Sequence, residues 1–295
     1  MNLKQLEYFV RVAELGSFSK AAMVLDIAQP ALSRQVRLLE TDLRANLLHR
    51  TGRGVALTEA GQRLFDHAVG ILQSVERATE DLESARGEPA GRIVIGLPPS
   101  IGRRLIVPLV EGFRQTLPRA RLAIVEGLST HVTEWIATGR VDLGLVHNPE
   151  PNPAIEVSRL LDEPLGLVGP AGDVPATLRW AELGSYPLIL PERGHAMRRL
   201  LEAQAAFAEV RLKVVMEVSS IPSILDLVAA GYGHAVLTET ALASWRRAGG
   251  FSLRRLVEPS VASTLFMAVS AQKPITPLGR RAMALLQDLV KTEMG

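Results

Sequence analysis

The stretch "QPALSRQVRLLE", Gln29 to Glu40, decides how the first part of this 295-residue chain is interpreted. Apolar residues recur in and after it at steps of four, three and four, which places them in one stripe along a helix: Leu32, Val36, Leu39 and Leu43. A different face carries polar and basic residues: Gln29, Ser33 and Arg37, flanked by Pro30 and Arg34. The pattern predicts an amphipathic helix, which is either an ordinary surface helix or a helix that reads DNA.

The segments on either side of this helix favour the second interpretation. Two short helical patterns precede it, one ending at Gly16 and one, "KAAMVLDI", with Ser17 or Ser19 as its cap. The segment "LLHRTGRGVALT" follows it and predicts a small hairpin, or wing, around Gly52 and Gly54. Three short helices and a hairpin form the winged helix-turn-helix layout, in which the third helix lays its N-terminal residues along base edges in the major groove.

The local charge agrees with DNA binding, although the charge of the whole chain does not point to it. The chain carries 33 basic and 31 acidic residues, a net charge of +2. Between Ala28 and Gly54, Glu40 and Asp42 are accompanied by five arginines: Arg34, Arg37, Arg44, Arg50 and Arg53. Arginine and glutamine side chains recognise guanine and adenine edges. The wing arginines are expected against phosphates or in the minor groove.

The segment "LEYFVRVAELGSFSKAAMVLDIAQPALSRQVRLLETDLRANLLHRTGRGVALTEAG" resembles the DNA-binding region of the LysR-type transcriptional regulators. The match covers about the first 61 residues, with the blocks "SFSKAA", "QPALSRQV" and "LLHRTGRGVALTEAG" in order. The resemblance implies that Gln29, Pro30, Ser33 and Arg34 contact bases. It also implies that Arg53 contacts the DNA backbone or the minor groove.

A long helix is predicted to follow the wing, capped by Thr58. Six apolar residues form a heptad seam along it: Leu64, Ala68, Ile71, Val75, Ala78 and Leu82. The seam fits either packing on the chain's own N-terminal domain or pairing with a second chain. The resemblance implies dimerisation through this helix, and in many members assembly of dimers into tetramers. The segment "RGEPAGR", Arg86 to Arg92, is predicted to be a hinge.

From Arg92 onward, short β-like runs alternate with helical stretches, which predicts a parallel sheet with helices on both faces. The region resembles the LysR-type effector domain, a periplasmic-binding-protein-like fold of two doubly wound α/β subdomains. The expected domains are a winged helix-turn-helix domain at 1–58, a linker and dimerisation helix at 59–87, and an effector-binding domain at 91–295. Within the last, subdomain I is expected at about 91–162 and 267–295, and subdomain II at about 163–266.

The sequence offers no catalytic constellation. It contains no cysteine, and its six histidines show no HxxxH or HExxH spacing. It also lacks a GxSxG elbow and a GxxxxGK[ST] phosphate loop, and "GYGHAV" at Gly231 is interpreted as a turn. We therefore expect no enzyme activity, no metal and no cofactor other than a small-molecule inducer.

Two predicted helix starts are candidates for binding the effector, one at Ser100 and one at Ser129 and Thr130. A helix N-terminus favours an anion, although simple helix caps give the same pattern. The resemblance implies that Ser100 and Ser129 line an inducer cleft from subdomain I. It places further positions in regions that face this cleft: His147, Arg193, His195, Ser219 and Ser220. Arg193 and His195 fit solvated loop residues equally well.

The sequence is therefore interpreted as a ligand-responsive transcriptional regulator, an activator of a nearby operon that responds to a small metabolite, with an anion weakly favoured. The expected partners are promoter DNA, the effector, further copies of the chain as a homodimer or homotetramer, and RNA polymerase. The N-terminus lacks the apolar core of a signal peptide, and no apolar run reaches the roughly 20 residues of a membrane span. The expected location is the cytoplasm, without a membrane partner.

Two other classes of function stay open at this point. One is a DNA-binding regulator that does not respond to a ligand. The other is a small-molecule-binding protein or an enzyme with an appended helical domain.

Overall fold

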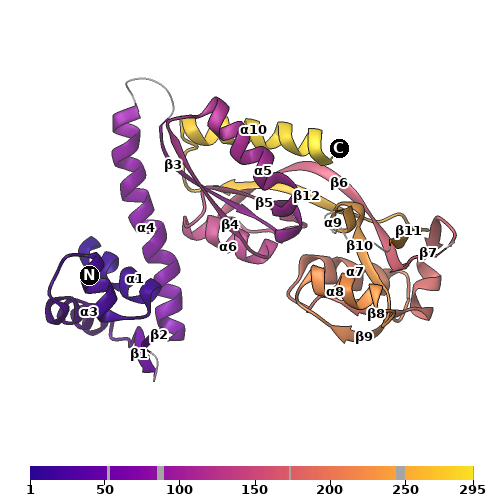
Figure 1. Ribbon diagram of the computed structural model, residues 1–295, viewed down its shortest axis with the longest axis horizontal. Coiled ribbons are helices and arrows are strands. Elements are labelled where there is room, and N and C mark those ends of the chain that lie inside the picture. Colours follow the sequence, from indigo (N-terminus) through magenta and orange to yellow (C-terminus); the bar gives the residue numbers. More distant parts are fainter. Residues whose placement is uncertain (52–53, 85–89, 173, 244–249, 295) are drawn as a thin grey trace. The chain divides into compact units, whose positions relative to one another are not determined.

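The computed structural model describes residues 1–51, 54–84, 90–172, 174–243 and 250–294 (Figure 1). The chain divides into an N-terminal unit, residues 1–87 with the short segment 137–141, and a C-terminal unit made of residues 88–136 and 142–295. Each unit is described by itself.

Three helices open the N-terminal unit: α1 (Leu3–Leu15), α2 (Phe18–Val24) and α3 (Gln29–Leu43). Asn2 caps α1 in a capping box with Gln5, and Gly16 ends the helix in the left-handed conformation, with φ 59°. Of the two serines expected to cap α2, Ser17 does so, because its hydroxyl accepts a hydrogen bond from the N–H of Lys20. These caps set α1 and α2 apart within a single tight turn.

The apolar stripe of α3 holds this helix against the other two. Leu32, Val36 and Leu39 are at most 1% exposed, and they pack with Tyr8, Phe9, Val12 and the alanines of α2. Leu43, which the spacing also placed in the stripe, is 37% exposed, so the buried stripe ends one turn earlier than predicted. With the apolar side fixed inward, the opposite side of α3 faces solvent.

A two-stranded wing follows, formed by β1 (Leu48–Thr51) and β2 (Gly54–Leu57) paired antiparallel. The N–H of Val55 donates to the carbonyl oxygen of Gly16 at 2.9 Å, so β2 lies directly on the turn between α1 and α2. Gly54 is needed at this approach, because it has φ 143° and an added Cβ would lie 2.4 Å from the oxygen of Gly16.

Helix α4 (Glu59–Ser84) completes the N-terminal unit, and Thr58 caps it as predicted. The Thr58 hydroxyl donates to the carbonyl oxygen of Asn46 and accepts the N–H of Gly61. Its first half packs on the chain's own core: Ala68 is fully buried, and Leu64 lies against the same cluster as Leu6 and Phe9. The first half of the helix is therefore committed to holding the DNA-binding fold.

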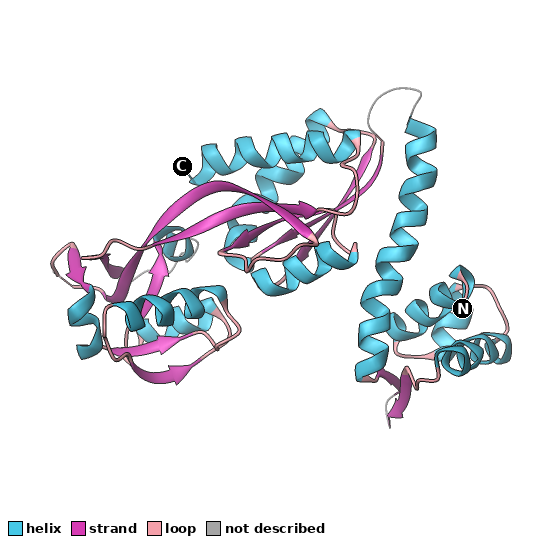
Figure 2. Cartoon of the chain, turned by 180° about the vertical axis from the view of Figure 1, so that it is seen from behind, coloured by secondary structure: helices cyan, strands magenta, loops and turns pink. Residues whose placement is uncertain are grey.

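The C-terminal unit contains three adjacent parallel strands in the order β4, β3, β5, with these bounds: β3 (Gly91–Leu97), β4 (Ala120–Glu126) and β5 (Leu143–His147). Helices α5 (Pro99–Thr116) and α10 (Pro277–Met294) cover one face of this sheet, and α6 (Ser129–Thr138) covers the other (Figure 2). The buried side chains between the sheet and the first two helices, such as Ile95, Leu105 and Leu286, form the first core.

Two long strands, β6 (Ile155–Pro170) and β12 (Ala262–Ser270), pair antiparallel and extend the same sheet. β10 (Ala235–Thr238) and β11 (Phe251–Val257) pair antiparallel with the far end of β6, and β7 (Thr177–Arg179) runs parallel to β11. The expectation of a parallel sheet is therefore correct for β3 to β5 and for the pair β7 and β11, and wrong for the antiparallel pairings of β6 with β10, β11 and β12. The α/β fold class itself is confirmed.

The far end of β6 lies between two further cores. On one side, α7 (Ala196–Phe207) and the short 3-10 helix η1 (Trp180–Ser185) bury Trp180, Leu183 and Leu201. On the other side, α8 (Ile221–Ala229) and α9 (Glu239–Ala243) bury Ile224, Val228 and Ala241. The parallel pair β8 (Pro187–Leu190) and β9 (Lys213–Glu217) completes this half.

The expected boundaries between the subdomains, 162/163 and 266/267, fall inside β6 and β12. The register between these strands shifts beside Leu160, which has no partner while Leu161 pairs with Leu265 and Arg159 pairs with Phe266. A β-bulge of this kind bends a strand locally. The two halves of the C-terminal unit therefore share two continuous strands with one irregular point between them.

Within the described part of the chain, no three His, Asp or Glu side chains converge in a way that would hold a metal ion. None of the helices described there has the length and apolar character needed to cross a membrane.

Gly54→Ala should lower the free energy of unfolding of the N-terminal unit by about 1–3 kcal/mol, because the added Cβ forces the wing away from the turn at Gly16. Hydrogen exchange of the peptides covering residues 1–57 measures this loss. Gly194→Ala is the control, since nothing lies within 4 Å of a Cβ built there. Equal exchange rates in both variants would show that the close approach does not hold the wing.

Candidate functional site

The outward side of α3 carries the residues predicted to contact DNA. Gln29 and Pro30 form its first turn, where Pro30 needs no hydrogen-bond partner, and both are exposed. Arg34 and Arg37 are exposed and form no ion pair with any described residue. Ser33 is half-buried at the edge of this face. The five residues share one solvent-facing surface at the N-terminal part of the helix, which we call the α3 face.

The acidic residues near the α3 face are engaged elsewhere. The carboxylate of Glu40 accepts the backbone N–H groups of Leu47 at 2.9 Å and Leu48 at 3.2 Å, which fastens α3 to the first strand of the wing. Asp42 pairs with the N-terminal ammonium of Met1 at 2.7 Å. Because both carboxylates have these partners, they leave the positive charge of the α3 face uncompensated.

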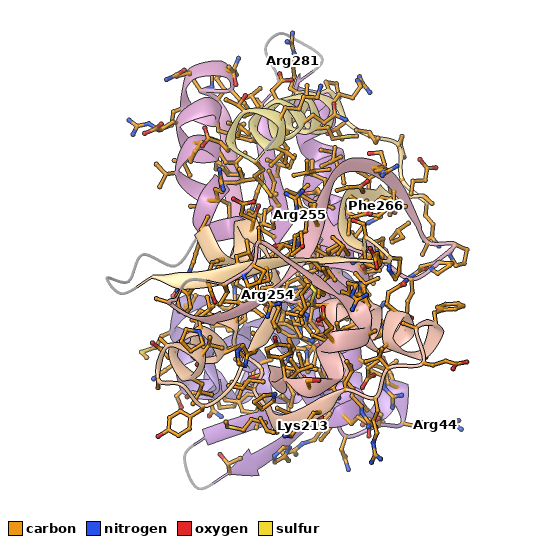
Figure 3. The ribbon with its side chains drawn as sticks, turned by 90° about the vertical axis from the view of Figure 1, so that its right-hand side faces the viewer. Arg44, Lys213, Arg254, Arg255, Phe266 and Arg281 are labelled. Atoms are coloured by element: carbon orange, nitrogen blue, oxygen red, sulfur yellow. The ribbon has the colours of Figure 1, made fainter. Side chains whose placement is uncertain are left out.

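The wing residues are placed only in part. Arg50 lies in β1 opposite Val55, and Arg53 lies outside the described residues. Arg44 caps the C-terminal end of α3 in the left-handed conformation, with φ 51°, and its side chain projects away from the ribbon (Figure 3). Arg44 was counted in the basic surplus of the sequence and adds an exposed cation at the far end of α3.

The predicted seam of α4 has two parts. Leu64 and Ala68 face the chain's own core, as described above. Ile71 and Val75 are 40% and 45% exposed, and Ala78 is also exposed. The side chain of Leu82 lies outside what the structure describes. An exposed apolar strip therefore runs along α4 from Ile71 to Ala78 and is shorter than the six-residue seam predicted from the sequence.

In the C-terminal unit, both predicted helix starts are present. α5 begins at Pro99 directly after β3, with Ser100 half-buried in its first turn, and α6 begins at Ser129. Ser129 is 8% exposed, and its hydroxyl accepts the backbone N–H of His147 at 2.9 Å. Thr130 is exposed. The hydroxyl of Ser129 thus joins α6 to the end of β5 by accepting this N–H, and Ser100 and Thr130 stand in the first turns of the same two helices.

His147 and His195 come close together, although 48 residues separate them. Burial lowers the pKa of His147 to about 4, helped by the neighbouring His195. Burial also lowers the pKa of His195 to about 4, helped by Arg199. The Nδ1 of His195 accepts the N–H of Met197 at 3.2 Å and caps α7. Both imidazoles are therefore neutral at pH 7, and His195 carries its proton on Nε2.

A buried carboxyl, which the sequence did not reveal, lies beside His147. Glu163 on β6 is 5% exposed, and one of its oxygens is 3.8 Å from the Nδ1 of His147. Because the imidazole is neutral, this approach is not an ion pair. Burial raises the pKa of Glu163, while the hydroxyls of Thr240 and Thr238 and the charge of Arg104 act in the opposite direction.

The opposite strand supplies further polar groups to the same place. Ser263 on β12 pairs in register with Glu163 and is fully buried. Its hydroxyl lies 3.3 Å from the Nδ1 of His147 and accepts a hydrogen bond from the amide of Asn148 at 3.0 Å. Together with His195, these side chains form a polar cluster at the junction of the two halves of the C-terminal unit, which we call the junction cluster.

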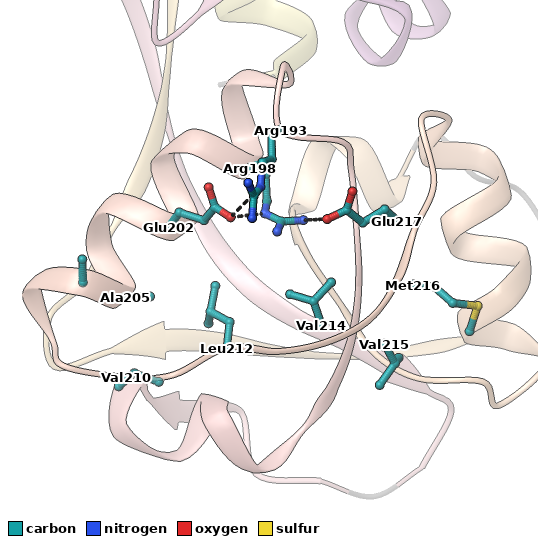
Figure 4. A pocket seen from close by; sticks show the side chains of 11 residues that line it. Arg193, Arg198, Glu202, Ala205, Val210, Leu212, Val214, Val215, Met216 and Glu217 are labelled. Atoms are coloured by element: carbon teal, nitrogen blue, oxygen red, sulfur yellow. Dashed lines mark hydrogen bonds and ion pairs between the residues drawn. The ribbon is translucent and has the colours of Figure 1, made fainter.

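The remaining predicted effector residues do not join the junction cluster through any described contact. Ser219 and Ser220 are exposed before α8, and Ser220 caps this helix without a side-chain hydrogen bond. Arg193 is 80% exposed and lies 4.0 Å from Glu202, at a groove of about 560 Å³ between α7 and β9 (Figure 4). In that groove the buried Arg198 pairs with Glu202 at 2.8 Å and Glu217 at 3.3 Å.

Sequence reasoning missed Glu163, Ser263 and Thr240 for a physical reason. Glu163 stands in "LLDEPLGLV", where an acidic residue before an apolar run reads as a solvent-exposed strand end. It is buried because β6 continues past it to Pro170, between its neighbour β12 and the residues of β10 and α9 that face the carboxyl, Thr238 and Thr240. The available signal was the length of the β-like pattern from Ile155 onward, which would have placed the acid in the middle of a strand.

Comparisons with known proteins agree with this architecture. The model "Bacterial regulatory helix-turn-helix protein, lysR family" matches residues 3–62, and the model "LysR substrate binding domain" matches residues 86–291. The nitrogen assimilation regulatory protein nac of Klebsiella aerogenes is 32% identical over 291 residues, which cover 98% of this chain and 95% of that protein. The HTH-type transcriptional regulator BbuR of Bordetella bronchiseptica is 31% identical, covering 98% of this chain and 89% of that protein.

Solved structures share the fold over the whole chain. A full-length OxyR variant from Pseudomonas aeruginosa is 25% identical, with a TM-score of 0.73, covering 100% of this chain and 96% of that one. Full-length CbnR, solved in complex with its target DNA, is 24% identical with a TM-score of 0.71, and the match covers 98% of this chain and 100% of that one.

The two neutral histidines predict a pH-dependent stability. Because burial lowers the pKa of His195 from 6.5 to about 4 in the folded state, the unfolded chain binds more protons between these values. The free energy of unfolding should therefore fall as the pH drops from about 6.5 to 4, by on the order of 1–3 kcal/mol for this histidine.

His195→Asn keeps a capping acceptor and removes the titrating group, so unfolding followed by the fluorescence of buried Trp180 should show a shallower loss of stability with acid. His131→Asn, at an exposed histidine on α6, is the control and should retain the wild-type slope. The same slope in all three proteins would mean that protonation of His195 does not oppose folding.

Proposed function

The chain belongs to the LysR family of bacterial transcriptional regulators, and we propose that it activates transcription of a nearby operon by binding promoter DNA as a homo-oligomer in response to a small molecule. The family consists of DNA-binding regulators rather than enzymes. In this assignment residues 1–58 read DNA, residues 59–87 pair two chains, and residues 91–295 bind the effector, with the subdomain boundary inside β6 and β12.

DNA recognition by the α3 face carries the proposal. Burial of the opposite stripe fixes the orientation of α3, so Gln29, Pro30, Ser33 and Arg34 are presented together at its N-terminal part. This is the part of a recognition helix that enters the major groove. Arg37 and the wing arginines, Arg50 and Arg53, are assigned to phosphates or to the minor groove.

The exposed strip of α4 supports pairing of two chains. Ile71, Val75 and Ala78 lie at steps of four and three, which is the spacing of a helix–helix seam. A two-fold pair of this helix would present two α3 faces to two half-sites about one turn of DNA apart, roughly 34 Å. Assembly of dimers into a tetramer and contact with RNA polymerase are the further steps that we assign to the activating complex in the cytoplasm.

The junction cluster and the two helix starts support effector binding. Ser100 and Thr130 offer hydroxyls at the N-termini of α5 and α6, and His147 joins the start of α6 to the junction cluster. Ser219 and Ser220 lie exposed before α8 and are assigned to the effector by the family resemblance alone. An effector that binds the closed arrangement of the two halves more tightly than the open one shifts the population towards closure. The bulge beside Leu160 lets the shared strands bend during this change. Arg193, at the separate groove, is retained only as a peripheral candidate.

Arg34→Ala should weaken binding to the promoter beside the chain's own gene by about 1–3 kcal/mol, because it removes a base contact at the centre of the α3 face. A gel-shift titration at several salt concentrations measures the affinity, and wild-type binding should fall steeply with salt. Arg11→Ala is the matched control, since Arg11 is exposed on α1 and pairs with Glu14. Wild-type affinity in the Arg34 variant would rule out the α3 face as the base-reading surface.

Ile71→Glu should convert the homo-oligomer to a monomer or sharply weaken its association, because it places a charge in the apolar strip of α4. Sedimentation velocity measures the oligomeric state. Gln62→Glu introduces the same charge on the opposite side of this helix, nine residues away, and should leave the assembly intact. A wild-type sedimentation profile for the Ile71 variant would contradict pairing through α4.

A further inference from the structure

Glu163 is a buried acid whose side chain lacks a hydrogen bond of normal geometry. Both of its carboxylate oxygens are inaccessible to solvent, and no described residue hydrogen-bonds either of them. Buried polar groups in folded proteins are nearly always paired, and a buried charge without a partner costs several kcal/mol. A carboxyl in this state needs a physical explanation, because it lies three residues from the β-bulge between the two halves of the C-terminal unit.

The groups around Glu163 do not supply a strong donor. On β5, His147 is neutral, and on α7 so is His195 beside it. On β12, the hydroxyl of Ser263 is directed to His147 and Asn148. On β10, the hydroxyl of Thr238 accepts the N–H of Ala241 at 3.2 Å. The hydroxyls of Thr238 and Thr240 lie beside the carboxyl and lower its pKa, but neither makes a hydrogen bond of normal geometry to its oxygens.

The cation that acts on Glu163 is Arg104 on α5, and its influence is the smallest of those that lower the pKa of Glu163. It does not form an ion pair with Glu163 within 4.0 Å. Since burial dominates and raises this pKa, the carboxyl tends towards its neutral form when no further partner is present. An added cation or N–H donor would reverse this balance by forming charge-assisted hydrogen bonds.

The location of Glu163 connects it to the proposed effector site. His147 joins Glu163 to the start of α6, because its Nδ1 faces Glu163 and its backbone N–H donates to the hydroxyl of Ser129. Arg104 joins Glu163 to α5, because it lies one helical turn after Ser100 on that helix. Glu163 is therefore linked to the start of α6 through His147 and to the first turns of α5 through Arg104.

We propose that Glu163 binds a protonated amine of the effector, which is therefore a small amino acid-like compound whose carboxylate is held at the helix starts of α5 and α6. The inference rests on the proposed function and specifies the chemical class of its effector. The amine arrives as an ammonium group, Glu163 is ionised in the complex, and any proton that the free carboxyl holds is released to solvent. The ammonium donates to the Glu163 oxygens, so Glu163 selects compounds that carry an amino group over those that lack one.

The test uses pairs of compounds that differ only in the amino group: alanine and propionate, aspartate and succinate, and glutamate and glutarate. Thermal-shift titrations of the full chain should show stabilisation by at least one amino acid and no stabilisation by its deaminated partner. Glu163→Gln should reduce the affinity for that amino acid at least tenfold, because the amide carries no charge and presents its own donors to the ammonium.

Glu163→Gln is expected to fold, since the amide matches the neutral acid in shape. Glu156→Gln, at an exposed acid on the same strand, is the matched control and should bind the amino acid like the wild type.

Three results would overturn the inference. They are stabilisation by a deaminated acid in the wild type and in Glu163→Gln alike, an unchanged affinity of Glu163→Gln for the amino acid, and failure of all three amino acids to stabilise the wild type. Each of these results leaves DNA binding by the α3 face untouched. Failure of the proposed function is separate, since it appears as loss of specific promoter binding in gel shifts without any added compound.

Discussion

The hydrogen bonds between β6 and β12 are the constraint on which the C-terminal unit depends. These strands run through both of its halves, so the core under α5 and α10 and the cores around α7 and α8 are attached to the same ladder. The ladder is continuous except beside Leu160, where its register shifts, and a β-bulge of this kind bends a strand locally.

The junction cluster lies at that place, and this explains its unusual composition. Glu163 and Ser263 are neighbours across the ladder, three residues beyond the bulge, and His147 ends the adjacent strand. Polar groups cost free energy in a core unless they are paired, so a fold that needed only stability would have apolar side chains here. A carboxyl and two neutral imidazoles beside the β-bulge form stronger interactions with a bound polar ligand than apolar side chains would.

The N-terminal unit could be predicted from the sequence almost completely, because its signals are local. The stripe of Leu32, Val36 and Leu39, the cap at Ser17 and the turn at Gly16 each act within one or two helical turns. The exceptions were Leu43, which is exposed, and the first half of the α4 seam, which packs on the chain's own core. Spacing shows that a residue is on an apolar face, but it does not show which neighbour covers that face.

The C-terminal unit was predictable in its class and helix positions, but not in its strand directions or its site. Antiparallel pairing of β6 and β12 joins residues more than a hundred positions apart, and no local pattern encodes such a partner. The same holds for the site. The hydroxyl of Ser129 accepts the N–H of His147 at the end of β5, a contact between two elements that the sequence could not indicate. Glu163, which the sequence analysis did not single out, is buried beside His147.

The burial of Glu163 changes what the proposed site can recognise. Helix starts at Ser100 and Ser129 by themselves favour any small anion, which is as far as the sequence goes. A buried carboxyl nearby gains charge-assisted hydrogen bonds only from a cationic donor, so it favours an acid that carries an ammonium group over the same acid without one. Because the histidines at the junction are neutral at pH 7, they do not cancel this preference. The discrimination follows from the position of one acid in the middle of a strand, where its side chain is buried beside His147.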